Sequence, residues 1–254
     1  MILVRILVNA VIIALELAMI AAVAWAGWRF PVPFALATGA LAFAIGLSLE
    51  RARLANELNF YVGGDHSRPR PFFIGTVALV EAATKGLLGG IAALLTFSGT
   101  DTSRLQWVAI VFGICLFAGT GLLRRLRLSL GARSARWGFF RLAGPLGLLF
   151  SAGVGCLVVM KLIPSTSLGD LARKLVLDTP ARPTIPQASE LLFLFKQYFD
   201  EVVVSLLSIF VTREAAQVLG ILFSVNMLTG FVVAVYAVLI AEAVKRMEQG
   251  AGIG

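Results

Sequence analysis

The feature that most constrains this chain is a series of apolar runs long enough to cross a lipid bilayer. A bilayer core about 30 Å thick needs roughly 20 apolar residues in a helix that rises about 1.5 Å per residue. Runs that approach or exceed that length give six predicted spans: 5–27, 33–49, 72–97, 105–123, 142–163 and 217–243. The sequence therefore predicts an all-α fold, a polytopic membrane helical bundle with six transmembrane helices.

The composition agrees with this class of protein. Of 254 residues, 59% are hydrophobic and 14% are charged, whereas a soluble domain carries about 25% charged residues. The net charge of +8 would also suit a nucleic-acid-binding protein, but the basic residues gather in short segments between the apolar runs, as they do in cytoplasmic membrane loops. We therefore expect the lipid bilayer as a partner and no nucleic acid.

The distribution of arginine among the connections predicts the orientation in the membrane. Residues 50–70 contain four arginines and residues 124–141 contain six, whereas the turns 28–32 and 98–104 contain one each. Loops rich in Lys and Arg remain in the cytoplasm. Both basic loops and both termini are therefore predicted to lie inside (N-in and C-in), in the inner membrane of a bacterial cell.

The two basic loops, 50–70 and 124–141, are also candidate contacts for anionic lipid. The second loop interleaves Leu, Trp and Phe with its arginines, a composition that suits the inner membrane surface. The same charges are explained by their role in setting topology. Residues 63–66, "GGDH", suit either a phosphate-binding motif or a turn that follows a helix.

The chain divides near residue 141 into two predicted units. Residues 1–141 form a four-helix membrane bundle with the two basic cytoplasmic loops. In it, Pro31 and Pro33 interrupt the helix between the first two spans, which we expect to pack as an antiparallel hairpin. Residues 142–254 form a two-helix unit with a long extracytoplasmic amphipathic segment, 164–216.

Polar residues recur at helical spacing within residues 188–212 of that segment. On a helix they fall on one narrow stripe, and Lys196 and Asp200 flank it as an i,i+4 pair. The stripe consists of Glu190, Gln197, Glu201, Ser205, Ser208 and Thr212. Three arrangements suit this pattern: an amphipathic helix on the membrane surface or packed on other spans, a re-entrant helix lining a wet cavity, and a seventh span.

The last span adds Asn226 and Thr229, neighbours on one helical face. They are predicted either to make interhelical hydrogen bonds or to line a cavity. Together with the stripe they form the candidate conduit or interface.

Three charged residues lie near the middle of predicted spans: Glu16, Glu81 and Lys85. A charge at the bilayer centre costs roughly 2.5–3.5 kcal/mol on insertion scales. Glu81 and Lys85 are spaced i,i+4 and can share a helical face, and we expect Glu16 to face one of them from the first span. Such an intramembrane polar network serves either as a structural clasp or as a proton or ion relay.

Small residues predict where the helices approach closely. Gly86 and Gly90 are spaced by four in the third span, Gly147 and Gly155 by eight in the fifth, and Gly230 lies within the sixth. These five glycines are the predicted helix-packing positions.

The final stretch, "VLGILFSVNMLTGFVVAVYAVLIAEAVKRM", resembles the inner pore helix of six-transmembrane cation channels, with Gly230 in mid-helix and a charged end. The resemblance implies ion conduction through an oligomeric pore with a re-entrant segment before the last helix. The corresponding segment, "VSLLSIFVTREAAQ", has no glycine and no potassium filter motif. The fourth span lacks the regularly spaced arginines of a voltage sensor.

These observations predict a channel-like or transport-like inner-membrane protein that moves an ion or small solute passively, as a homo-oligomer or with other membrane subunits. The alternative is a non-catalytic subunit or scaffold of a larger membrane complex. With two cysteines in apolar runs and one histidine, the sequence offers no catalytic, cofactor-binding or metal-ligating constellation. It is not expected to be an enzyme.

Overall fold

The chain is helical, without strands, over the residues that the structure describes. The structure is a computed structural model, and it describes residues 2–61, 70–163, 171–173 and 184–251. Its helices are α1 (Ile2–Arg29), α2 (Pro31–Tyr61), α3 (Arg70–Thr96), α4 (Thr102–Leu130), α5 (Ser134–Arg141), α6 (Ala143–Val159), α8 (Ile185–Leu207), α9 (Arg213–Phe223), the 3-10 turn η1 (Val225–Leu228) and α10 (Thr229–Gly250). This confirms an all-α polytopic membrane bundle.

Within that part of the chain, five helical stretches are long and apolar enough to cross a membrane. A sixth arises when α5 and α6, which meet at a bend of 59°, are counted as one span. The predicted fifth span, 142–163, therefore corresponds to α6 as the straight part of a bent pair. The predicted second span, 33–49, lies within α2, which continues from its apolar half into the arginine-containing segment up to Tyr61.

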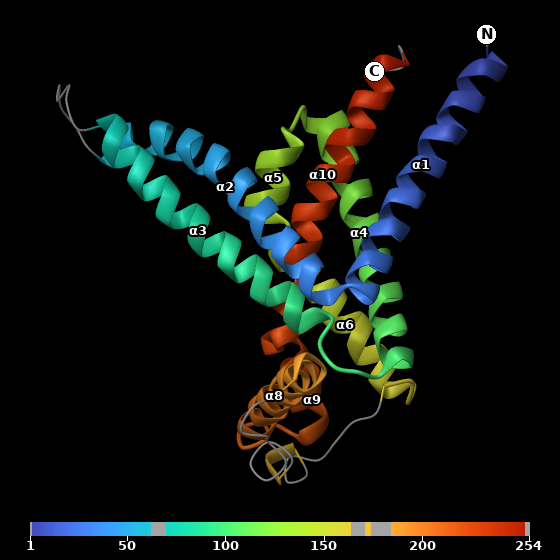
Figure 1. The fold of residues 1–254 in the computed structure, drawn as a ribbon, viewed down its shortest axis with the longest axis vertical. Helices are drawn as coiled ribbons and strands as arrows, with labels where there is room; N and C mark the ends of the chain where they lie inside the picture. Colours follow the sequence, from blue (N-terminus) through green and yellow to red (C-terminus); the bar gives the residue numbers. More distant parts are fainter. Residues whose placement is uncertain (1, 62–69, 164–170, 174–183, 252–254) are drawn as a thin grey trace.

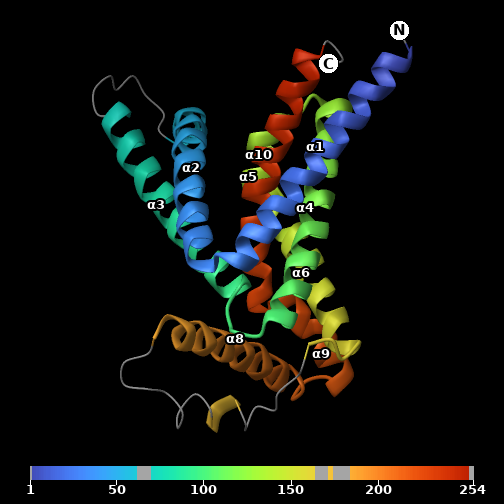
Figure 2. The same cartoon turned by 45° about the vertical axis from the view of Figure 1, so that its right-hand side comes forward.

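The helix ends divide the molecule into two sides (Figures 1 and 2). The start of α1, the end of α10 and the α4–α5 connection lie on one side, called the basic end below. Helices α8 and α9 lie on the opposite side, called the α8 end. The start of α1 and the end of α10 thus share a side with the α4–α5 connection, which lies within the arginine-rich segment 124–141, and six spans require this alternation.

Helices α1 and α2 diverge from Phe30 in a V, so the predicted hairpin of the first two spans is wrong (Figures 1 and 2). Pro31 and Pro33 lie in the first turn of α2, where the missing backbone N–H groups break no helical bond. Helix α2 pairs with α3, and α1 packs against α4 and α10. The V thus has two arms, the α2–α3 hairpin and the remaining bundle.

An aromatic cluster joins the two arms near the vertex. Phe34 stacks on Tyr236 with ring centroids 5.1 Å apart and meets the edge of Phe97 at 5.5 Å. Phe97 in turn contacts Phe112 at 5.3 Å. Each such pair contributes about 0.5–1.5 kcal/mol beyond burial. The cluster therefore fixes α2, α4 and α10 at the vertex, while the arms separate toward the basic end.

Helix α8 lies across the α8 end of the bundle, transverse to the spans (Figure 2). Residues 188–212 belong mostly to this transverse helix, which packs on the bundle, is not among the candidate spans and is followed by the short helix α9. Residues 164–170 and 174–183 of the predicted segment 164–216 lie outside the described residues.

The predicted last span, 217–243, is interrupted. Ser224 has extended backbone angles (φ −63°, ψ 144°) between α9 and η1, and α10 begins only at Thr229. The interruption has a local cause, since the Ser224 hydroxyl accepts from the Asn226 N–H at 3.1 Å and caps the new turn. The interruption places Ser224 and Asn226 next to α8.

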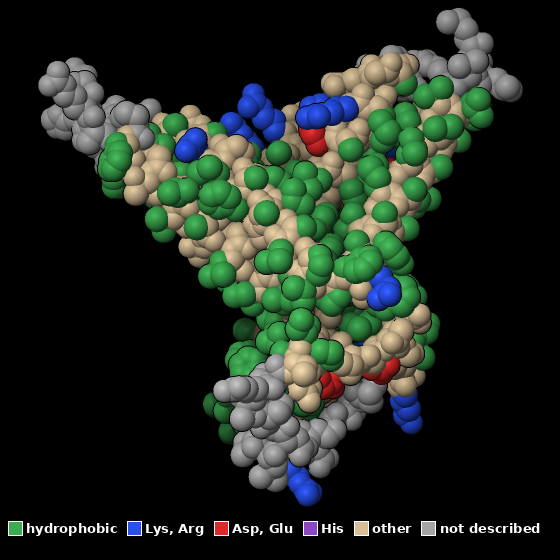
Figure 3. Space-filling view, viewed as in Figure 1, with side chains coloured by type: hydrophobic (Ala, Val, Ile, Leu, Met, Phe, Trp, Pro, Cys, Tyr) green, Lys and Arg blue, Asp and Glu red, His purple; other side chains and the backbone are tan. Residues whose placement is uncertain are grey.

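The surface follows the expected membrane pattern. Hydrophobic side chains cover the sides of the helices, and Lys and Arg gather between the arms at the basic end on the face shown in Figure 3. The polar groups described next are therefore exceptions in an apolar molecule.

Candidate functional site

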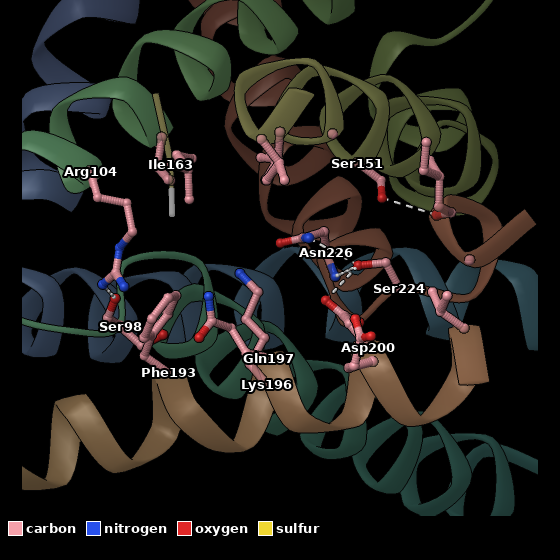
Figure 4. A pocket seen from close by; sticks show the side chains of 18 of the residues that line it. Ser98, Arg104, Ser151, Ile163, Phe193, Lys196, Gln197, Asp200, Ser224 and Asn226 are labelled. Atoms are coloured by element: carbon pink, nitrogen blue, oxygen red, sulfur yellow. Dashed lines mark hydrogen bonds between the residues drawn. The ribbon is translucent and has the colours of Figure 1, made fainter. Parts of the chain in front are cut away.

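A polar cavity lies between α8 and the bundle at the α8 end (Figure 4). Its volume is about 230 Å³. Charged and amide side chains line one part of it, and aliphatic side chains line the rest. The polar lining comprises Thr96, Ser98, Arg104, Ser151, Lys196, Gln197, Asp200, Glu201, Gln217, Ser224 and Asn226. We call this space the α8 cavity.

Helix α8 is held over the cavity by hydrogen bonds to the α3–α4 turn. The Gly99 N–H donates to the Ser189 hydroxyl at 2.9 Å, and the Thr100 N–H and hydroxyl both donate to a Glu190 carboxylate oxygen at 3.0 Å. These bonds satisfy backbone groups of a turn that has no intrahelical partners. They fix the first half of α8 against the bundle.

The second half of α8 is fixed by Asp200. Its two carboxylate oxygens accept from the Val225 N–H at 2.8 Å and from the Ser224 hydroxyl at 3.0 Å. Burial raises the pKa of Asp200 above its ordinary value, and these two hydrogen bonds and nearby Lys196 partly oppose that shift. Asp200, a residue of α8, therefore caps the chain at Ser224 and Val225, where the helix is interrupted before α10.

Two cations are buried at the cavity. Arg104 is 4% exposed and Lys196 is 8% exposed. Arg104 donates to the Ser98 carbonyl at 2.7 Å and lies over the Phe193 ring, 3.2 Å from its centroid. Lys196 donates to the Leu95 carbonyl at 3.3 Å, and burial lowers its pKa to about 8.

Neither cation has a carboxylate within 4.0 Å among the described residues. Two amide oxygens, Gln197 Oε1 and Asn226 Oδ1, are also buried without a hydrogen-bond partner in the described ranges. Buried polar groups in folded proteins are normally paired. The cavity therefore concentrates unused donors and acceptors in one place.

The predicted conduit stripe is only partly at this cavity. Gln197, Glu201 and Asn226 line it. The Thr229 hydroxyl pairs with that of Thr96 at 2.7 Å, and Thr96 is a lining residue. Glu190 instead binds Thr100, and the Ser208 hydroxyl donates to the Ser205 carbonyl at 2.7 Å, away from the cavity.

The face of α8 that points into the cavity is centred on Lys196 and Asp200, the two residues predicted to flank the stripe. The i,i+4 pair was visible in the sequence, but its members contact the bundle rather than each other. Arg104, from the α4 start, was missed as a site residue. Its signal was its position as the single cation in the turn 98–104.

A second charged cluster lies within the α2–α3 hairpin, and we call it the hairpin network. Lys85 pairs with Glu50, which is fully buried, and Arg53 bonds Glu81 at 2.8 Å and Glu50 at 3.2 Å. Arg53 also lies 3.4 Å from Glu57. The expected pair of Glu81 with Lys85 on one helix is thus replaced by ion pairs to α2.

The predicted contact of Glu16 with Glu81 or Lys85 is wrong. Glu16 is buried in the other arm of the V, at a cavity of about 10 Å³ that it lines with Arg124 and Arg127. The reason is the divergence of α1 from α2, which leaves α1 on α4 rather than beside α3. Nearby, Glu248 of α10 pairs with Arg127 and, at 2.7 Å, with Arg124.

The five predicted packing glycines all lie at close approaches. A Cβ on Gly86 would lie 3.0 Å from the Gly39 carbonyl, one on Gly90 3.4 Å from the Ala35 carbonyl, and one on Gly155 3.3 Å from Ile221 Cδ1. At Gly147 and Gly230 an added Cβ would overlap backbone atoms of the facing segment. Helix α6 therefore crosses the η1–α10 junction almost backbone to backbone.

A shallow hollow of about 450 Å³ lies at the basic end. Its lining is basic and aromatic, with one acid, and consists of Arg53, Glu57, Arg136, Trp137, Phe140 and Arg141. It joins the two segments predicted to contact anionic lipid, 50–70 and 124–141, and that contact remains a prediction.

The fold and the α8 cavity define a multi-pass membrane protein with a partly open polar cavity at the α8 end of its helices. No protein-family model matches the chain, and neither does a curated protein or a solved structure.

Proposed function

We propose that this protein is a transport protein that moves a small polar solute across the membrane, with the α8 cavity as its binding site. The observation that supports this is the cluster of buried charges and amides at the α8 cavity, where Arg104 and Lys196 have no carboxylate partner among the described residues and aliphatic side chains form much of the remaining lining. Ligand sites are typically concave and apolar with a few convergent polar groups. In membrane proteins, charged residues at depth commonly mark a solute pathway.

The proposed transport is gated rather than an open pore. Between the cavity and the basic end, α10 contributes Val232, Val233, Ala234 and Val235, all fully buried. Passage then needs a conformational change. The interruption at Ser224 is a favourable place for it, since backbone angles there already depart from the helix.

We place the basic end in the cytoplasm and the α8 cavity on the outer side of a bacterial inner membrane, because positively charged segments remain inside. Thiol labelling of intact cells checks this orientation. A cysteine at exposed Arg213 in a variant lacking Cys115 and Cys156 should react with an impermeant maleimide, and one at exposed Arg136 should not. The reverse pattern would contradict the assigned orientation.

Flux into liposomes tests the transport proposal. The purified protein is reconstituted and challenged with gradients of acetate, glycerol 1-phosphate, glycine and potassium chloride, and uptake is followed by light scattering. We expect uptake of at least one of these solutes above the level of protein-free liposomes. The matched variant Val154→Trp, which fills the cavity without changing its charges, should abolish the excess, whereas equal uptake by protein-free liposomes for every solute rejects transport.

A second candidate function is that of a subunit that binds a partner through α8. The observation favouring it is the apolar outward surface of α8 and the turn after it, which includes Leu192, Phe195, Phe199, Leu206, Ile209 and Phe210, all exposed. Mass measurement after gentle solubilisation separates the two. A particle containing only copies of this chain favours transport, with the homo-oligomer that we expect, and a stoichiometric second protein favours the subunit.

A further inference from the structure

We infer that the ligand of the α8 cavity is a small organic anion, a carboxylate or phosphate ester with a compact apolar body, held by Arg104 and Lys196. The inference rests on the proposed role of the cavity as a binding site, and it assigns the chemical class of the ligand. The charge, the size and the orientation of the ligand each follow from a different observation.

The charge follows from the count of unused donors. A guanidinium carries five N–H donors and an ammonium three, yet each of these side chains makes one hydrogen bond among the described residues, to Ser98 and Leu95 respectively. The surrounding acids act on the cations only beyond salt-bridge distance: Glu190 and Asp101 on Arg104, and Asp200 on Lys196. A buried cation without an anionic partner is unfavourable, and a bound anion removes that cost.

Two acids near the cavity, Asp200 and Glu190, are bound to other groups, whereas Glu201, which is half-buried, lines the cavity with no hydrogen bond or ion pair among the described residues. Asp200 accepts from Val225 and Ser224, and Glu190 accepts twice from Thr100. A cationic ligand at either of these two acids would have to compete with these bonds, whereas an anionic ligand meets donors that are still available. The two buried cations outnumber the one acid that remains available, Glu201, and this difference favours an anionic ligand.

The size follows from the cavity volume and its apolar walls. An apolar cavity of about 150 Å³ holds benzene, and the α8 cavity has about 230 Å³. The remaining space suits one carboxylate or phosphate group. The aliphatic lining consists of Val108, Val154, Val158, Ile163, Leu171, Val204 and Ile221.

The orientation follows from the placement of the cations. Arg104 comes from the α4 start and Lys196 from α8, and the two side chains approach the cavity from different elements (Figure 4). The inferred anionic group lies between the two elements, within reach of a cation from each. The Gln197 and Asn226 amides lie beside Lys196 and Asp200 in the same view and offer further polar contacts.

A charge series on one ring tests the class of ligand. The full chain, in phosphatidylcholine nanodiscs, is titrated by calorimetry with benzoate, phenyl phosphate, benzamide and benzylamine. We expect benzoate or phenyl phosphate to bind at least tenfold more tightly than the neutral amide and the amine. Equal or tighter binding of benzamide or benzylamine would overturn the inference.

Variants tie that binding to the two cations. Lys196→Met and Arg104→Met should each raise the Kd for the preferred anion at least tenfold, and Arg213→Met, which removes an exposed cation at the same end, should not change it. Because a charge variant can fail to fold, Val154→Trp is the second probe, since it keeps both cations and removes the space. Unchanged affinity in Val154→Trp or in a folded Lys196→Met would place the anion elsewhere and reject the site.

Two arms of the experiment distinguish a free anion from a lipid headgroup as the source of the same chemistry. If the natural ligand is a phospholipid, nanodiscs containing phosphatidylglycerol should weaken benzoate binding by competition, and the Lys196→Met variant should lose that effect. If it is a free anion, phosphatidylglycerol should leave the Kd unchanged. Anion binding without flux in liposomes would keep this inference and reject transport, whereas flux without anion preference would do the opposite.

Discussion

The hairpin network and the α8 cavity both bury charge, but they treat it in opposite ways. In the hairpin network, Glu50 lies between Arg53 and Lys85, and every cation has a carboxylate. Phe140 covers both cations, with Lys85 Nζ 4.7 Å and Arg53 Cζ 5.6 Å from its ring centroid. At the α8 cavity, Arg104 and Lys196 have carbonyl and aromatic contacts but no carboxylate partner among the described residues.

The difference separates a structural cluster from a binding site. The ion pairs of the hairpin network, with Phe140 of α5 over both cations, join α2, α3 and α5 and give each cation a carboxylate partner. Buried charges with spare donors beside a cavity are typical of functional sites. The following predictions test whether the two clusters respond in opposite directions when charge is removed.

The largest effect is expected for Glu50→Gln. This change leaves Lys85 and Arg53 short of their shared carboxylate, and removing one partner of a buried ion pair costs about 3–5 kcal/mol. Unfolding in a series of detergent mixtures with rising dodecyl sulfate should show this loss. Glu57→Gln, at the exposed edge of the same network, is the control and should change stability by less than about 1 kcal/mol; equal losses would show that the network does not act through Glu50.

A pH dependence is expected from Lys196. The folded-state pKa is about 8, below the ordinary value of 10.5, so between these values the unfolded chain binds more protons than the folded one. Stability should therefore rise with pH across that window, by at most about 1.4 kcal/mol per pH unit. Asp200, Glu201 and Arg104 are the charged neighbours at the cavity.

The check is thermal unfolding at pH 8, 9 and 10 without ligand. The slope should disappear in Lys196→Met, which has nothing to titrate there. A slope that persists in this variant would assign the effect to another group.

At neutral pH, Lys196→Met should raise the stability of the protein while it weakens binding of the anion. The variant replaces a buried unpaired charge with an apolar chain of similar length, and such changes at functional sites typically add about 0.5–2 kcal/mol while function is lost. Unfolding under the conditions used for Glu50→Gln measures the sign. A loss of stability as large as that of Glu50→Gln would show that removing a charge has the same effect on stability in both clusters.

The smallest effect concerns the hollow at the basic end. Arg136→Gln should weaken association with phosphatidylglycerol by about 1 kcal/mol, the contribution of one arginine near an anionic surface. Retention of labelled lipid during purification measures it, with Lys161→Gln at the α8 end as the control. Equal retention by Arg136→Gln and the unchanged protein would restrict the role of this arginine to topology.

The sequence predicts the helices well, because each apolar run must satisfy its own backbone hydrogen bonds inside a membrane. It predicts the partners of helices poorly. Helical periodicity gives the spacing of a face but not its rotation or its neighbour, so Glu81 and Lys85 were assigned to Glu16 although α2 supplies their counterions. The polar stripe of α8 was recognised, but the cavity-facing side is rotated toward Lys196 and Asp200, and Arg104 joins it from a turn distant in the sequence.

The interruption at Ser224 has a consequence for communication between the two membrane surfaces. Asp200 attaches α8 to the segment that starts α10, and Glu248, near the other end of α10, is attached to Arg124 and Arg127 of α4. Helix α10 is thus held at both ends, by Asp200 through the segment that precedes it and by Arg124 and Arg127 through Glu248. A ligand in the cavity that displaced α8 would act on the contact of Asp200 with Ser224 and Val225. The resulting movement of α10 would be detected at its other end, where Glu248 contacts Arg124 and Arg127.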